Sequence, residues 1–286
     1  MRIDVNIRST EILSHNFFSK EDGYRMSRTA LITGGSSGLG FELAKNLAEK
    51  GFTTIIIARN REKLDRAVKE MGSSGHDVSG FQCDITDEDR LGEVFREVKE
   101  RFGRIDFLVL NAGVVTCKLL ADFKNSEELK RDLKINLWGT ILSTYVFLPL
   151  LNPGARILMI SSGFGLMGPA GYSVYAASKA GMINFAESLR RELLHKKISV
   201  HVACPGDMDT PQYHEEHRTM PAWMKQDAPR GMMHPKKAAE KILKKCTGNR
   251  LLVIINFEIL GLILFTRLLP RKLRDAILDR MFPLPH

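Results

Sequence analysis

The sequence has few of the features that mark secreted or disulfide-bonded proteins. It holds four cysteines among 286 residues, Cys83, Cys117, Cys204 and Cys246, and none has the CxxC spacing of a zinc or redox site. The first 25 residues contain no apolar run of the kind that a signal peptide needs. We therefore expect a chain of the reducing cytoplasm, in which Cys83 and Cys204 close strand-like segments as buried thiols.

Signatures of nucleic-acid binding and of a metal site are also lacking. No helix-turn-helix, zinc-finger or RNA-binding motif accompanies the net charge of +9, so nucleic acid is not an expected partner. His214 and His217 lack the HExxH order of a zinc protease, and no metal is expected. Basic residues gather near the end, where positions 236–286 hold eleven Lys/Arg and four Asp/Glu. Such a segment fits an anionic membrane surface, although a solvated basic face on two helices is about equally compatible.

Apolar β-branched segments alternate with amphipathic ones, which is the pattern of βαβ units. We expect strands at 29–33, 52–58, 78–83, 105–110, 155–161, 198–204 and 250–256. We expect helices at 38–50, 61–70, 87–102, 127–150, 173–195 and 235–246, the third with Thr86 as its N-cap. The strands are apolar almost throughout, so helices should cover both faces. The fold class is α/β, a doubly wound parallel sheet of the Rossmann type.

No linker divides the chain into two cores, so a single domain is expected over residues 26–256. Within it, residues 207–234 form the longest irregular segment and are interpreted as a lid. Residues 1–25 are predicted to be a disordered extension, and residues 257–286 to form hydrophobic and amphipathic helices.

The segment TGGSSGLG follows the first predicted strand and opens the first helix. Glycines at Gly34, Gly38 and Gly40 permit a tight turn, and backbone amides beside Ser36 and Ser37 can approach a pyrophosphate at the helix N-terminus. Plain packing of strand against helix is the alternative reading of the glycines. The position in the first βαβ unit favours dinucleotide binding.

The end of the second strand reads IIIARNR and lacks the carboxylate that would bind the ribose 2′-hydroxyl of NAD. Arg59 stands there instead and can bind a 2′-phosphate in bidentate fashion. An ordinary surface arginine is the alternative. We predict NADP (NADPH) as the cofactor.

In YAASK, Tyr175 and Lys179 have the i,i+4 spacing that places phenol and ammonium on one helical face. A nearby ammonium and an oxidised nicotinamide both favour the phenolate, so we expect them to bring the pKa of Tyr175 down towards the working range. Ser162 ends a predicted strand, where its hydroxyl can meet a carbonyl held by Tyr175.

Together these motifs resemble the short-chain dehydrogenase/reductase family over residues 28–246. Further positions resemble the family's motifs: Asp84 (adenine contact), Asn111, Ala112 and Gly113 (the NAG motif), Asn136 (active-site Asn), and Pro205, Gly206 and Thr210 (nicotinamide carboxamide).

The resemblance implies an oxidoreductase that transfers hydride between nicotinamide and a carbonyl carbon. Tyr175 would exchange the proton, Ser162 would orient the carbonyl, and Lys179 would also bond the nicotinamide ribose. Asn136 would support a water that relays protons to Lys179. The resemblance further implies a homodimer or homotetramer, packed through the helices near 127–150 and 173–195.

The segment from Cys204 to Pro221 resembles the matching segment of 3-ketodihydrosphingosine reductases, with Gly206 and Met208 as departures. It suggests a lipid-like carbonyl substrate, with 3-ketosphinganine favoured. One alternative is a soluble enzyme acting on a small ketone, a steroid- or retinoid-like alcohol or a 3-oxoacyl group. Another is a non-catalytic NADP-binding regulatory protein.

The apolar run from Leu251 to Leu269 nearly reaches the length of about 20 residues that spans a bilayer, but it contains Glu258 and Arg267. Once the last strand takes residues up to 256, the remaining helix of 12 residues covers roughly 18 Å, which is too short to cross. Pro270 then separates it from a basic amphipathic helix. We expect this pair to lie on the cytoplasmic face of a membrane as a peripheral contact. A dimer contact or a pocket wall is the alternative.

Overall fold

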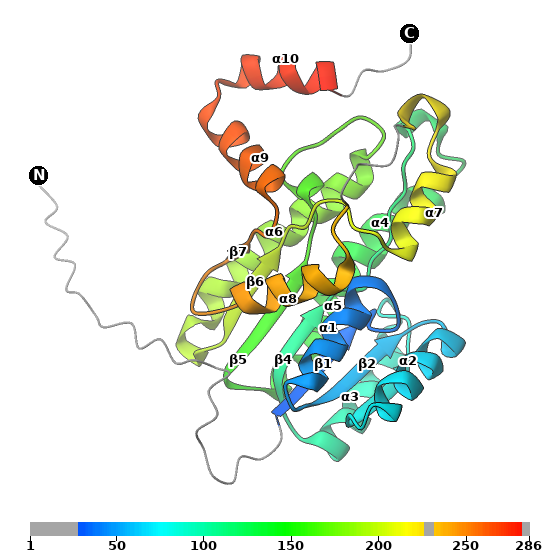
Figure 1. The fold of residues 1–286 in the computed structure, drawn as a ribbon, viewed down its shortest axis with the longest axis vertical. Helices are drawn as coiled ribbons and strands as arrows, with labels where there is room; N and C mark the ends of the chain where they lie inside the picture. The colour runs from blue at the N-terminus through cyan, green and yellow to red at the C-terminus, as the bar shows by residue number, and fades with distance from the viewer. Residues whose placement is uncertain (1–27, 226–231, 282–286) are drawn as a thin grey trace, which may run out of the picture.

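The computed structural model describes residues 28–225 and 232–281. Its strands are β1 (Arg28–Thr33), β2 (Phe52–Ala58), β3 (Val78–Gln82), β4 (Ile105–Leu110), β5 (Leu151–Ile160), β6 (Ser199–Ala203) and β7 (Leu252–Val253). They form one parallel seven-stranded sheet in the order β3-β2-β1-β4-β5-β6-β7 (Figure 1). The expected doubly wound fold is confirmed. The extension expected at residues 1–25 lies outside the described residues.

The helices of the domain are α1 (Gly38–Glu49), α2 (Arg61–Ser73), α3 (Glu88–Phe102), α4 (Ser126–Asp132), α5 (Gly139–Phe147), α6 (Ser173–Leu193), α7 (Pro211–Thr219) and α8 (Pro235–Lys245). Short 3₁₀ segments are η1 (Leu120–Asp122), η3 (Leu148–Leu150), η4 (Gly163–Gly165), η5 (Leu194–Lys196) and η6 (Ala222–Met224), and η2 (Leu133–Trp138) is a π-helical turn. Two further helices follow β7, namely α9 (Phe257–Leu268) and α10 (Arg271–Met281).

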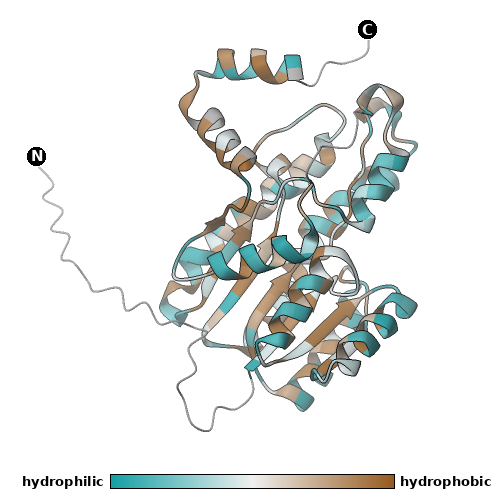
Figure 2. Ribbon diagram, in the orientation of Figure 1, coloured by the Kyte–Doolittle hydropathy of each residue, from teal (hydrophilic) through white to brown (hydrophobic). Residues whose placement is uncertain are grey.

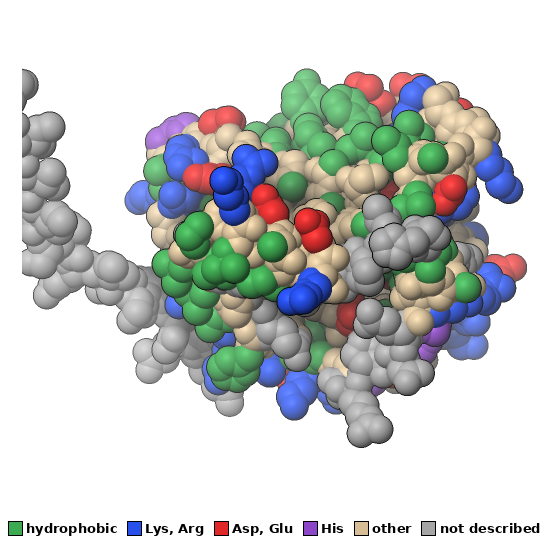
Figure 3. All heavy atoms as spheres, turned by 90° about the horizontal axis from the view of Figure 1, so that it is seen from above, with side chains coloured by type: hydrophobic (Ala, Val, Ile, Leu, Met, Phe, Trp, Pro, Cys, Tyr) green, Lys and Arg blue, Asp and Glu red, His purple; other side chains and the backbone are tan. Residues whose placement is uncertain are grey.

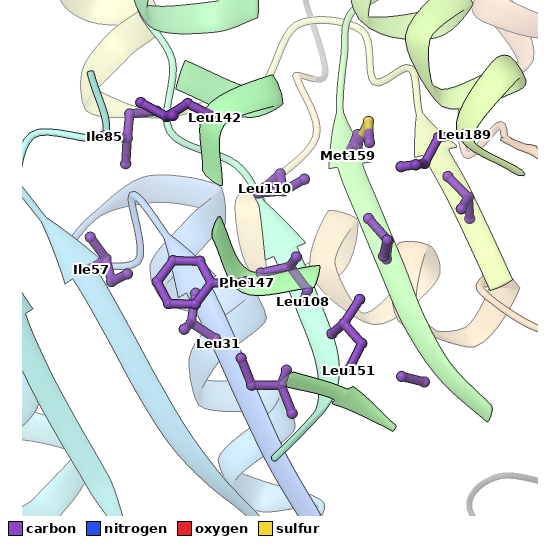
Figure 4. Close-up of a cluster of buried hydrophobic side chains, with 14 of the residues drawn as sticks. Leu31, Ile57, Ile85, Leu108, Leu110, Leu142, Phe147, Leu151, Met159 and Leu189 are labelled. Carbon is purple, nitrogen blue, oxygen red and sulfur yellow. The ribbon is translucent and has the colours of Figure 1, made fainter. Parts of the chain in front are cut away.

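The core forms two layers, one on each face of the sheet, because successive strand residues point to opposite faces. Leu31 belongs to a core cluster with residues of α3, α5 and α6, whereas its neighbour Ile32 belongs to a cluster with residues of α1, α2 and α8. Figure 4 shows the first layer, where Phe147 lies against Leu31 and Ile57. In Figure 2 the strands are mostly hydrophobic and the outer helices carry hydrophilic residues, as expected for a sheet covered on both faces.

The single helix expected over 127–150 is interrupted by the π-helical turn η2, between α4 and α5. Such turns occur mostly as single-turn bulges inside α-helices, and frequently at functional sites. Asn136 lies in this turn, and its backbone carbonyl accepts a hydrogen bond from Thr140 Oγ1 at 2.7 Å. Periodicity alone could not place the bulge, since the residues on either side remain helical.

The lid also differs from the prediction, because residues 207–234 are not irregular throughout. Helix α7 begins at Pro211, and the Thr210 side chain accepts a hydrogen bond from the Tyr213 amide at 3.3 Å. Thr followed by Pro is an N-cap and first-turn pair, so the sequence did carry the signal. Residues 226–231 of the predicted lid lie outside the described residues.

Two smaller expectations are wrong. Asp87, not Thr86, caps α3 by accepting from the Arg90 amide at 3.0 Å, because Thr86 donates its own amide and hydroxyl to Asp84. The last strand covers two residues instead of 250–256, because the chain then turns from the sheet edge into α9.

The expected pair of C-terminal helices, α9 and α10, is present on either side of Pro270. In Figure 1 both project from the end of the sheet at which α7 also lies. Among residues 28–225 and 232–281, no helix is both long enough and apolar enough to cross a membrane. Residues 282–286 of the predicted segment are not among those described.

Candidate active site

A cavity of about 740 Å³ opens at the carboxyl ends of the strands, where ligands bind in open parallel sheets. Every predicted site residue except Asn136 lines it: Gly34, Ser36, Ser37, Gly38, Gly40, Arg59, Asp84, Asn111, Ala112, Gly113, Ser162, Tyr175, Lys179, Pro205, Gly206 and Thr210. The topology therefore brings together, in one cavity, residues that are separated by up to 176 positions.

The glycine turn at the start of α1 leaves no room for side chains. Gly34 has φ +68°, and a Cβ there would lie 2.7 Å from the Cα of Ala112. A Cβ on Gly40 would lie 2.2 Å from the carbonyl oxygen of Gly34. The Asn111 side chain donates to that same oxygen at 3.1 Å, so β4 holds the turn in place.

The N-terminus of α1 faces this turn. Ser37 precedes the helix in an extended conformation, and its side chain makes no capping hydrogen bond, so the cap leaves first-turn amides open to a ligand. A close glycine cradle and a helix N-terminus on one cavity fit the pyrophosphate of a dinucleotide.

At the far end of the cavity, Arg59 follows β2 and lies 3.7 Å from Asp84 (Nη1 to Oδ2). Lys63, in the first turn of α2, lines the cavity as well. Sequence reasoning missed Lys63, although its position four residues after Arg59 could have indicated it. Two cations at this place fit a 2′-phosphate.

Ser162, Tyr175 and Lys179 meet at the inner wall of the cavity. The Lys179 ammonium donates to the Ile160 carbonyl oxygen at 2.9 Å and lies 5.7 Å from the centre of the Tyr175 ring. A hydrogen bond between the Ser162 and Tyr175 side chains favours the phenolate and opposes the rise in the pKa of Tyr175. Both Tyr175 and Lys179 are buried.

Burial dominates the titration of both groups. It raises the pKa of Tyr175 above its ordinary value, and the carboxylates of Glu216, Asp132 and Asp207 raise it further. Burial lowers the pKa of Lys179 to about 8. Desolvation of the phenolate is the largest effect on this pKa, and the expected lowering of it by Lys179 stays a prediction. The protonated phenol that results is the form able to donate a proton.

Asn136 lies behind the cavity wall and is fully buried. Its side chain accepts from the Val114 amide at 2.8 Å and donates to the Val114 carbonyl at 2.9 Å and to Ser178 Oγ at 3.0 Å. Asn136 therefore joins the loop after β4 to α6. Its expected role in holding a water stays a prediction.

Glu216 lines the cavity and Tyr172 packs against Tyr175. The sequence motifs had given neither residue a role. Tyr172 lies edge-on to Tyr175, with ring centroids 6.2 Å apart, and donates to Glu216 Oε1 at 2.5 Å. Glu216 belongs to α7 and lines the cavity. The two residues are 44 positions apart, so their contact depends on how α7 folds back over α6.

Helix α9 packs next to the site. Ile259 is buried, and a Cβ on Gly163 would lie 2.5 Å from its Cδ1. A Cβ on Gly206 would lie 3.7 Å from the same atom. The start of α9 thus packs on the turns that follow Ser162 and Pro205.

The family model for short chain dehydrogenases matches residues 28–221, and the chain belongs to this family of oxidoreductases, which uses nicotinamide cofactors. Carbonyl reductase family member 4 of Xenopus laevis is 37% identical over 187 residues, which cover 65% of this chain and 77% of the relative. The 3-oxoacyl-[acyl-carrier-protein] reductase of Homo sapiens is 35% identical over 187 residues, with the same two coverages.

Solved structures agree in fold. A short chain dehydrogenase from Burkholderia cenocepacia, in complex with NADP, has a TM-score of 0.71 and 27% identity, covering 82% of this chain and 98% of that one. An actinorhodin polyketide ketoreductase with NADPH has a TM-score of 0.72 and 28% identity, covering 80% and 95%.

Proposed function

We propose that this protein is an NADPH-dependent reductase of a long-chain keto-lipid, with 3-ketosphinganine as the favoured substrate. The main support for reductase activity is that Ser162, Tyr175 and Lys179 line the same cavity as the glycine turn. Mere cofactor binding does not need the proton-transfer groups. Their presence disfavours a non-catalytic NADP-binding protein.

NADPH is supported by the chemistry of the cavity. Gly34 and Gly40 leave space for the pyrophosphate, and Arg59 and Lys63 place positive charge where a 2′-phosphate would lie. Pro205, Gly206 and Thr210 would contact the carboxamide, and Lys179 would hold the nicotinamide ribose. The names of two structural relatives, which bind NADP and NADPH, point the same way.

The residues of the chain handle the proton and the developing charge. When bound, NADPH supplies the hydride that the carbonyl carbon accepts. Tyr175, protonated because burial raises its pKa, donates its proton to the carbonyl oxygen. The Ser162 hydroxyl orients that oxygen and stabilises its negative charge. Lys179, whose pKa is lowered to about 8, can give up a proton near neutral pH to restore the phenol.

A lipid substrate is supported by the position and surface of α9. Ile259 packs against the turn after Ser162, while Phe257, Leu260, Leu264 and Leu268 form a stripe on the outer face and are 91%, 44%, 51% and 75% exposed. Their spacing of three, four and four residues places them on one side of the helix. The helix therefore offers an apolar surface that begins beside the turn after Ser162 and runs outwards.

The same surface supports peripheral contact with an anionic membrane. In α10 the exposed Arg271, Lys272 and Arg280 lie beside the half-exposed Leu273. Seen from above in Figure 3, this end of the molecule shows hydrophobic side chains together with Lys and Arg side chains. Apolar area with basic residues at its rim is the combination that binds anionic lipid.

A second candidate is a reductase of a 3-oxoacyl group, a small ketone or a steroid- or retinoid-like alcohol. The names of relatives at 35–37% identity favour it, since they are a carbonyl reductase and a 3-oxoacyl-[acyl-carrier-protein] reductase. Such substrates do not need α9 and α10, so removal of residues 257–286 would leave their turnover intact if the shortened chain still folds.

The test is a turnover screen of ketones with NADPH and NADH side by side, using 3-ketosphinganine, other long-chain ketones and a soluble 3-oxoacyl thioester. We expect turnover of 3-ketosphinganine with NADPH. Tyr175→Phe should lower kcat by at least about a hundredfold, because the proton donor is lost, while NADPH binding is retained. Turnover of other lipid ketones without 3-ketosphinganine would reject that substrate, and turnover of the thioester alone would favour the second candidate.

A further inference from the structure

The lid helix α7 carries two adjacent carboxylates in different surroundings. Glu215 is exposed, and its carboxylate pairs with Arg218 at 2.7 Å. Glu216 is half-buried, lines the active-site cavity and accepts a hydrogen bond from the Tyr172 hydroxyl at 2.5 Å. Glu215 also lines the cavity, but only Glu216 of the two is bonded to Tyr172 and acts on the charge of Tyr175.

Tyr172 fixes Glu216 beside the catalytic phenol. Its ring is buried, lies edge-on to Tyr175 and packs on Phe164 with ring centroids 4.7 Å apart. A hydroxyl bonded to a carboxylate in a partly dry site holds that carboxylate in place, because both groups lose a charge-assisted hydrogen bond if they separate. A negative charge thus stands on the lid side of Tyr175.

The electrostatics of the cavity indicate which substituent would be bound next to the ketone. Burial raises the pKa of Glu216, which reflects the cost of keeping its charge there, and the nearby carboxylate of Asp207 raises the pKa further. A cationic group on the substrate would offset this cost. A carboxylate would be repelled, and a neutral group would gain nothing.

We propose that Glu216 selects long-chain ketones that carry an ammonium group on the carbon next to the carbonyl. This inference rests on the proposed function, whose favoured substrate, 3-ketosphinganine, has an amine at that position. With the carbonyl oxygen at Ser162 and Tyr175, the substituent of the neighbouring carbon lies close to the phenol and within the field of Glu216. Tyr172 acts as the positioning residue for that carboxylate.

The experiment compares kcat/KM with NADPH for 3-ketosphinganine and for an otherwise identical ketone with hydrogen in place of the ammonium group. The proteins are the full chain, Glu216→Gln, and Glu215→Gln as a matched control that removes the adjacent charge. We expect the wild-type protein to prefer the amino ketone at least about tenfold, and Glu216→Gln to lose most of that preference. Glu215→Gln should keep the wild-type ratio.

An unchanged ratio in Glu216→Gln, or equal use of both ketones by the wild-type protein, overturns the inference and leaves the proposed function standing. Reduction of neither ketone refutes the proposed function, and the inference with it. If Glu216→Gln fails to unfold cooperatively on heating, Glu216→Asp replaces it, because this variant keeps the charge but withdraws it by one methylene. The preference must then fall as well, and an unchanged preference overturns the inference.

Discussion

The titration of Lys179 depends strongly on where the fold places it. Its ammonium is buried against the Ile160 carbonyl, and its pKa is lowered to about 8. Burying an ammonium is costly even when it is hydrogen-bonded. A residue that a stable fold would avoid is retained here for its chemistry.

Replacement of Lys179 by an apolar residue should therefore raise the stability of the folded protein while removing its activity. The unfolded pKa is 10.5 and the folded pKa about 8, so between these values the unfolded chain holds a proton that the folded chain has released. The contribution of Lys179 to the free energy of unfolding thus rises with pH in this window and is most unfavourable below pH 8. We expect Lys179→Met to abolish turnover and to raise the free energy of unfolding at pH 7 by about 1–3 kcal/mol.

Urea unfolding at pH 7 and at pH 10 checks this prediction. The gain of the Met variant over the wild-type protein should shrink at the higher pH. A Met variant that unfolds at a lower urea concentration at pH 7 would show that the hydrogen bond to Ile160 outweighs the cost of burial.

A second prediction concerns Arg59, whose side chain is 66% exposed at the predicted 2′-phosphate position. Arg59→Ala should raise the Kd of NADPH about 10–100-fold through loss of a charge-assisted contact, and change that of NADH much less. Arg61→Ala is the matched control, since Arg61 is also 66% exposed but pairs with Asp65 at 2.8 Å. Fluorescence titration measures both. Equal weakening of NADPH and NADH would contradict the role of Arg59.

Among the elements, those with strong periodicity were predicted well and those fixed by tertiary contacts were not. The apolar segments of β1, β2 and β4 and the capped helix α3 follow from local pattern. The π-helical turn at Asn136 does not, because it depends on hydrogen bonds to Val114 and Ser178, which are distant in sequence. The two-residue β7 is set by the edge of the sheet, not by its own composition.

Strand β6 contains a histidine that the sheet keeps neutral. His201 is fully buried, its Nδ1 lies 2.6 Å from the Arg250 carbonyl oxygen, and burial lowers its pKa to about 4. The ring donates from Nδ1, and Nε2 has no hydrogen-bond partner among the described residues. Protonation would therefore place an unsolvated charge in the sheet.

The protein should lose stability in acid partly through this residue. The unfolded pKa is 6.5, so as the pH falls from 6.5 to 4 the unfolded chain gains a proton that the folded chain does not bind. We expect a loss of about 2–3 kcal/mol from His201 across this window. His201→Leu should show a flatter pH dependence in urea unfolding. His195→Gln, at an exposed site in η5, should keep the wild-type slope, and equal slopes for all three proteins would refute the prediction.

Across the whole molecule, sequence motifs predicted the cofactor-binding and catalytic residues of the candidate site. They did not predict the contacts that surround the expected substrate position. The glycine turn, Ser162, Tyr175 and Lys179 were each placed by a local pattern and a family resemblance. The Tyr172–Glu216 contact, and the packing of Ile259 on Gly163, join segments that only the folded chain brings together. Assembly into a dimer or tetramer stays a prediction, which the exposed Trp138 and Tyr145 near α5 support.

Membrane contact is a property of the whole chain and can be tested as such. We expect the full chain to sediment with vesicles that contain an anionic phospholipid, and much less with neutral vesicles, because α9 and α10 combine apolar and basic side chains. Leu264→Asp should weaken sedimentation. Leu194→Asp is the control, since Leu194 is equally exposed, at 51%, but lies in η5. Equal recovery of all proteins in the absence and presence of vesicles would refute the membrane contact.

The most direct test of the central claim follows deuterium from NADPH labelled at the transferable C4 position into 3-ketosphinganine. We expect a product with one deuterium on the former carbonyl carbon, formed by the wild-type protein and at least about a hundredfold more slowly by Tyr175→Phe. A product without deuterium, or equal rates for the two proteins, would contradict hydride transfer at this site.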